Sequence, residues 1–64
     1  MVTSIPQFRE HEGSYYGVGK GGRSWRITAT LTGWRLEFRD PGDSAATYAG
    51  THATVALAEQ EAQR

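Results

Sequence analysis

The fold is decided by residues 24–40, which read SWRITATLTGWRLEFRD. Two runs of alternating apolar and polar side chains lie here, separated by Thr32-Gly33. Alternation of this kind places every second side chain of a β-strand on the same face. We therefore predict a β-hairpin that turns at Thr32-Gly33 and forms the centre of one small domain.

A two-residue loop at Thr32-Gly33 would set the register of this hairpin. Apolar residues would then face apolar ones, and a slip by one residue would send half of them to the wrong face. The expected core face is Trp25, Ile27, Ala29, Leu31, Trp34, Leu36 and Phe38. The same register places Arg26 opposite Arg39, a like-charge pair that costs stability and that Glu37 partly offsets.

A further strand is expected before the hairpin and another after it. Residues 14–18 (SYYGV) predict a strand with Tyr16 and Val18 facing the core and Tyr15 facing away. Residues 40–43 (DPGD) predict a turn, since proline suits its second position and glycine its third. Residues 45–49 predict a short strand with Tyr48 inward.

A helix is expected at the C-terminal end, capped by Thr54 and running from Val55 to about Gln63. Its narrow apolar stripe contains Val55, Ala58 and Ala62, aided by Leu57. A helix this short is not stable alone in water, so it must pack on the apolar face of the sheet.

Residues 1–13 allow two interpretations. Ser4 and Gln7 fit a capping box that would begin a short helix ended by Gly13. Alternatively, the segment is a flexible arm with Ile5 and Phe8 against the core. The fold class is therefore α+β, with an antiparallel sheet of three to four strands, a C-terminal helix on one face and, in the first interpretation, a short N-terminal helix.

Size and composition predict one domain of 64 residues that needs additional stabilisation. A chain this short buries only about 60% of its unfolded surface. It has no cysteine, which excludes disulfides and thiolate metal sites. Aromatic packing around Trp25, Trp34, Phe38 and Tyr16 must supply the stability, or the chain forms a homo-oligomer. No apolar run approaches the roughly 20 residues of a membrane span, so we expect a cytoplasmic protein with no membrane partner.

Charge is zero overall but unevenly distributed. Residues 20–39 carry a net +4, while residues 40–64 carry −3. A neutral net charge does not favour nucleic acid as a partner. Arginine outnumbers lysine six to one and asparagine is absent, a usage typical of GC-rich genomes. We therefore expect an actinobacterial or other high-GC source, or a phage of such a host.

No pattern predicts catalysis, a cofactor or a metal. Residues 17–22 match G-x-G-x-x-G, but a strand rather than a helix follows, so a hairpin loop is expected there instead of a phosphate site. His11 and His52 show no metal-ligand spacing. Nothing places a nucleophile beside a base. We predict a protein that is not an enzyme.

The polar face of the hairpin is the candidate binding surface, since three arginines on a flat sheet suit an anionic partner. An ordinary solvated face with local ion pairs is the alternative. The predicted partner-binding residues are Arg26, Thr28, Arg35, Glu37 and Arg39, together with an exposed Tyr15.

Residues 24–64 resemble the AP2-like arm-binding domains of phage and transposon integrases. The resemblance is carried by Trp25, Phe38, Thr54, Ala58 and Ala62, which match a tryptophan strand, a second strand and a capped helix with alanines four residues apart. It implies a three-stranded sheet packed on a helix. It also implies that the exposed sheet face enters the DNA major groove through Arg26, Thr28, Arg35 and Arg39.

These observations predict a small protein-interaction module, a phage or accessory protein that binds a host or partner protein in the cytoplasm. Two alternatives stay open. The first is a DNA-binding accessory module that uses the same arginine-bearing face. The second is a structural subunit of a larger assembly.

Overall fold

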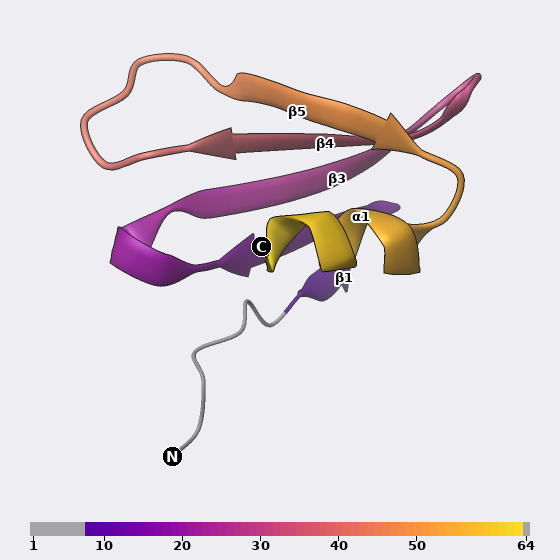
Figure 1. Ribbon diagram of the computed structural model, residues 1–64, viewed down its shortest axis with the longest axis horizontal. Helices are drawn as coiled ribbons and strands as arrows, with labels where there is room; N and C mark the ends of the chain where they lie inside the picture. The colour runs from indigo at the N-terminus through magenta and orange to yellow at the C-terminus, as the bar shows by residue number, and fades with distance from the viewer. Residues whose placement is uncertain (1–7, 64) are drawn as a thin grey trace.

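The computed structural model describes residues 8–63, and within them the chain forms five strands, one 3₁₀ turn and one α-helix. The elements are β1 (Arg9–His11), β2 (Ser14–Val18), η1 (Lys20–Gly22), β3 (Ser24–Thr30), β4 (Gly33–Arg39), β5 (Thr47–His52) and α1 (Val55–Ala62). The strands form one antiparallel sheet in the order β1-β2-β3-β4-β5. Helix α1 lies across one face (Figure 1). The predicted α+β class and the C-terminal helix are confirmed.

Strand β1 occupies residues that one of the two interpretations placed in the second half of an N-terminal helix. Glu12 and Gly13 have φ of 51° and 85°, and positive φ at both loop positions is what a type I′ hairpin turn requires. The Glu10 carboxylate also accepts a hydrogen bond from the Gly13 N–H at 2.8 Å. Gly13 thus reverses the chain instead of ending a helix. The predicted sheet of three to four strands was too small, because residues 8–63 form five. Phe8 packs against the core, while the predicted cap at Ser4 lies outside the described residues.

The central hairpin forms between β3 and β4, but the predicted register is wrong by two residues. Ile27 pairs with Leu36, and the chain turns at Leu31-Thr32. A type I′ turn at Thr32-Gly33 would need positive φ at the β-branched Thr32. Instead, Gly33 takes a φ of 147° as the first residue of β4. A two-residue shift keeps every side chain on its face, so the alternation fits both registers.

The core lies between the sheet and α1. Its buried residues are Trp25, Ile27, Leu36, Ala58 and Ala62. Trp34, Phe38 and Tyr15 are partly buried and pack against this cluster. Two residues of the predicted core face are exposed, because Ala29 and Leu31 lie toward the hairpin tip.

The sidedness predicted for β2 is also wrong. Tyr15 pairs with Ile27 and lies on the helix side, where its ring meets Trp34 edge-on at 5.8 Å. Gly17, on the same side, pairs with Trp25. Tyr16 therefore lies on the opposite face and is 43% exposed.

Strand β5 begins and ends later than predicted, and it carries an irregularity. Phe38 pairs with Thr47 and Glu37 with Tyr48, but the register shifts between Leu36 and Glu37. Tyr48 shares the outward face with its partner and is 59% exposed, so the expected inward Tyr48 is wrong. Ala49, next to the irregularity, packs against the core.

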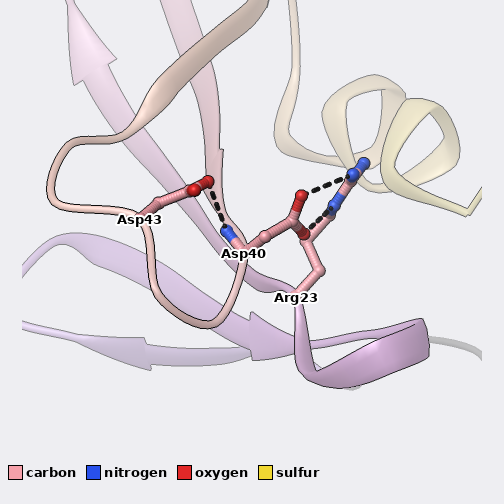
Figure 2. A network of polar contacts seen from close by, with 3 residues as sticks. All are labelled: Arg23, Asp40 and Asp43. Atoms are coloured by element: carbon pink, nitrogen blue, oxygen red, sulfur yellow. Dashed lines mark hydrogen bonds and ion pairs between the residues drawn. The ribbon is translucent and has the colours of Figure 1, made fainter.

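A clamp of polar contacts joins the η1 loop to the turn after β4 (Figure 2). Arg23 donates to both carboxylate oxygens of Asp40, at 2.7 and 3.0 Å, and its guanidinium stacks 3.9 Å from the Phe38 ring centroid. The Asp43 N–H donates to the Asp40 carbonyl oxygen at 3.0 Å, which confirms the predicted turn. The hydrogen bond from Arg23 lowers the pKa of Asp40.

Helix α1 begins as predicted. The Thr54 hydroxyl accepts a hydrogen bond from the Leu57 N–H at 3.1 Å, as an N-cap does. Ala58 and Ala62 are buried against the sheet, and their small side chains let the helix approach the strands closely. Leu57 is 46% exposed and contributes less than expected.

Candidate binding surface on the open sheet face

The face of the sheet opposite α1 is called the open face here, because no helix of residues 8–63 covers it. The strand registers place its side chains in rows across the strands. One row is Arg9, Tyr16, Arg26, Glu37 and Tyr48. The next is His11, Ser14, Thr28, Arg35 and Thr51. A third, shorter row is Val18, Ser24 and Arg39.

An ion pair occupies the middle of the open face. Arg26 and Glu37 are direct cross-strand partners, and an Arg26 guanidinium nitrogen donates to Glu37 Oε1 at 2.8 Å. This hydrogen bond raises the pKa of Arg26. The predicted Arg26–Arg39 pairing is wrong, because the observed register sets Arg39 opposite Ser24. Glu37 neutralises Arg26 directly.

The remaining arginines of this face keep their charge available. Arg35 lies 5.9 Å from the Tyr48 ring centroid, and the Tyr48 hydroxyl is 2.7 Å from the Thr51 hydroxyl. Arg9 and Arg39 make no ion pair within the part of the chain that the structure describes. These three guanidinium groups can therefore meet a partner without first breaking a salt bridge.

Charge is divided between the two sides of the sheet. The open face holds four arginines and one glutamate, a net +3 with histidine neutral. The other described acidic residues lie in turns, on the helix-side face of β1 or on α1; they are Glu10, Glu12, Asp40, Asp43, Glu59 and Glu61. The zero net charge thus conceals a positive face.

The structure brings together five of the six predicted site residues. Arg26, Thr28, Arg35, Glu37 and Arg39 share the open face. Tyr15 does not, since it packs on the helix side. Sequence reasoning missed Tyr16 and Tyr48, the two exposed aromatic residues of this face. Tyr16 pairs with Arg26 and Tyr48 pairs with Glu37. These polar partners indicate that both tyrosines point outward.

A groove of about 370 Å³ opens at one end of the open face. Tyr16, Ser24 and Arg39 line it together with the Arg26–Glu37 pair. Residues 44–46 of the loop between β4 and β5 also line it. The groove thus combines one uncommitted arginine with serine hydroxyls and alanine methyl groups.

The glycine-rich loop before β3 offers no open cradle for phosphate. The Gly19 N–H donates to the Arg23 carbonyl oxygen at 2.7 Å, and the Gly22 N–H donates to the Gly19 carbonyl oxygen at 3.2 Å. Two of the amides that a phosphate would need are therefore already bonded within the loop. Among residues 8–63 no cluster of three or more histidine or acidic side chains is placed to hold a metal.

Comparison with protein-family models, with curated proteins and with solved structures finds no match. In the described part of the chain, no helix has the length and apolar character needed to cross a membrane.

Proposed function

We propose that this chain is a small non-enzymatic protein-interaction module that binds an acidic surface of another protein through its open face. The observation that carries the proposal is the net +3 of the open face, which also exposes Tyr16 and Tyr48. Arginine and tyrosine are enriched where protein interfaces gain most of their binding energy. Such a module would suit a phage or accessory protein acting in the host cytoplasm.

Arg9, Arg35 and Arg39 have no carboxylate partner among residues 8–63 and should contribute more to binding than Arg26 does. A surface ion pair contributes little because each charge is already solvated. An arginine that is desolvated against a partner carboxylate instead forms a bidentate, charge-assisted contact. Arg9, Arg35 and Arg39 are available for this role, while Arg26 is held by Glu37.

Affinity capture with matched variants tests this function. The face variant replaces Arg9, Arg35 and Arg39 by glutamine and keeps the Arg26–Glu37 pair. The control is Lys20→Gln, which removes an exposed cation from η1 and not from a strand of the open face. We expect a protein retained by the wild type and the control, lost by the face variant, and bound with salt-dependent affinity when purified. A partner held equally by all three forms would exclude the open face.

Duplex DNA is the second candidate partner, favoured by the separation of charge across the sheet and by the resemblance to arm-binding domains. Titration with random duplex DNA at 50 and 200 mM salt tests it. DNA binding through three or four phosphate contacts would give a slope of log affinity against log salt of roughly −2.7 to −3.6. No binding at the lower salt concentration would exclude this candidate.

Self-association is a third possibility, since a second copy would enlarge a small core. The face variant distinguishes self-association from binding to another protein or to DNA. Sedimentation of the wild type and the face variant at high concentration should give the same mass if the open face binds a different protein. A dimer that dissociates only in the face variant would assign the open face to a second copy.

A further inference from the structure

The groove at the end of the open face is bordered on one side by a loop, unlike the flat sheet surface around it. The loop between β4 and β5 contributes residues 44–46 to its lining, while β2, β3 and β4 contribute the sheet side. At about 370 Å³ it lies at the lower end of the range for ligand pockets. A volume of this size accommodates one or two amino-acid side chains.

The charges in the groove leave one positive group uncompensated. Arg26 and Glu37 neutralise each other through their 2.8 Å contact. Arg39 also lines the groove and has no ion-pair partner among residues 8–63. Ser24, its cross-strand neighbour, and Ser44 add hydroxyl donors. The groove therefore complements one negative charge with hydrogen-bonding oxygens.

We propose that this groove anchors a single glutamate or aspartate side chain from an acidic peptide segment of the partner protein. The inference rests on the proposed function and names the chemistry of its central contact. Arg39 binds the carboxylate, and Ser24 and Ser44 donate to it. The Tyr16 ring and the alanine methyl groups of residues 45–46 pack against the methylene groups of the bound side chain.

The balance of charge in the groove favours a peptide over a nucleic acid. Glu37, whose side chain is only 15% exposed, lies in the lining and neutralises Arg26, so the groove offers Arg39 alone to an anion. Duplex DNA carries about one negative charge per 1.7 Å of its axis. An acidic peptide can instead place one carboxylate in the groove and direct its other side chains toward Arg35 and Arg9.

The probe for the test is acetyl-tetraglutamate amide, with acetyl-tetraglutamine amide as the uncharged control. Backbone and arginine side-chain NMR shifts of the ¹⁵N-labelled protein report binding residue by residue. Arg39→Gln is compared with Arg9→Gln, which removes the same charge from the same face outside the groove. Ala46→Phe fills the groove without a change of charge. The spectrum of each variant verifies that it is folded.

We expect tetraglutamate to shift the resonances of Ser24, Ser44 and Arg39, and tetraglutamine to leave them unchanged. Arg39→Gln should weaken binding about tenfold or more, as loss of a charge-assisted hydrogen bond does. Arg9→Gln should weaken it less than about threefold, the scale of an exposed charge pair. Ala46→Phe should reduce binding as Arg39→Gln does.

Two results would overturn the proposal that the groove anchors a carboxylate, while leaving the proposed function intact. One is an equal loss for Arg39→Gln and Arg9→Gln, which would mean that the face attracts anions as a whole. The other is an equal shift of the groove resonances by an oligothymidylate of matched charge, which would assign the groove to a phosphate chain. Absence of any shift on the open face, with the peptides and with duplex DNA, would overturn both proposals.

Discussion

At the scale of single residues, Arg23 connects two loops that lie 17 positions apart in the chain. Its guanidinium bonds to Asp40 and covers the Phe38 ring, so it shields one end of the core from water. Lysine has one charged nitrogen and no planar fork, and it cannot reproduce both contacts. The clamp therefore requires arginine rather than any cation.

Asp40 should make stability depend on acid pH. Its pKa in the folded protein is lowered by the hydrogen bond from Arg23, so its contribution is complete above the unfolded value of about 3.9. That contribution is lost as the pH falls through the lower, folded pKa. Urea unfolding should show wild type more stable than Asp40→Asn at pH 6, and the difference should shrink at pH 2.5. A constant difference would contradict this role.

Gly33 should tolerate substitution less well than Gly42. Both have positive φ, 147° and 93°, and an L-residue there is strained by about 1–3 kcal/mol. A Cβ at Gly33 would also lie 2.6 Å from the His52 carbonyl oxygen, whereas a Cβ at Gly42 meets nothing within 4 Å. Thermal unfolding should therefore show Gly33→Ala to be clearly more destabilising than Gly42→Ala. Equal losses of stability in the two variants would mean that His52 moves away from the new methyl group at no cost in free energy.

At the scale of secondary-structure elements, the register of the central hairpin depends on which charges face each other. Arg26 is paired with Glu37, and opposite charges at this position contribute about 0.2–1 kcal/mol. Arg26→Glu and Glu37→Arg should each destabilise the protein, and the double exchange should recover most of the loss.

A double-mutant cycle in chemical denaturation measures this coupling. The control cycle combines Arg26→Glu with Arg39→Glu, because these residues would pair only in the register shifted by two. A larger coupling between Arg26 and Arg39 than between Arg26 and Glu37 would contradict the observed register.

The sequence predicted the faces of β3 and β4 and the cap of α1, because alternation and capping are local patterns. It did not predict the register, since shifts by two residues preserve the alternation. Cross-strand charge was the available signal: one register pairs Arg26 with Arg39 and the other pairs it with Glu37. The sequence did not decide which of the adjacent Tyr15 and Tyr16 faces the core. Gly17, the next residue, has no side chain, so the alternation of apolar and polar residues is interrupted there.

Most of the candidate surface followed from the hairpin alone, but its shape did not. The groove exists because residues 44–46 lie near Arg39 and Ser24. The loop containing them has no periodic pattern, and it follows the Arg23–Asp40 clamp, which joins residues 17 positions apart. Contacts of this kind join distant residues, so a reading of local patterns does not find them.

At the scale of the whole molecule, stability rests on the few side chains of residues 8–63 that are buried. A chain of 64 residues has a free energy of unfolding of roughly 3–10 kcal/mol. Leu36 is fully buried, and its truncation to alanine should cost about 2–5 kcal/mol. Leu36→Ala should therefore lose a large share of the unfolding free energy, measured by urea unfolding followed by circular dichroism.

The matched control makes the same chemical change at the hairpin tip. Leu31 is fully exposed, so Leu31→Ala should change the unfolding free energy by less than about 0.5 kcal/mol. A loss comparable to that of Leu36→Ala would place Leu31 in a contact that the structure does not contain, such as an interface between copies.

The simple order of the sheet has a consequence for how the chain acquires its structure. Each strand pairs with the one synthesised just before it, so the sheet can grow one hairpin at a time, without a long loop to close. Helix α1 follows all five described strands, and its docking completes the core around Ile27 and Leu36. During synthesis on the ribosome, the strands can pair early, but the apolar side of the sheet stays open until the last turn of the helix emerges.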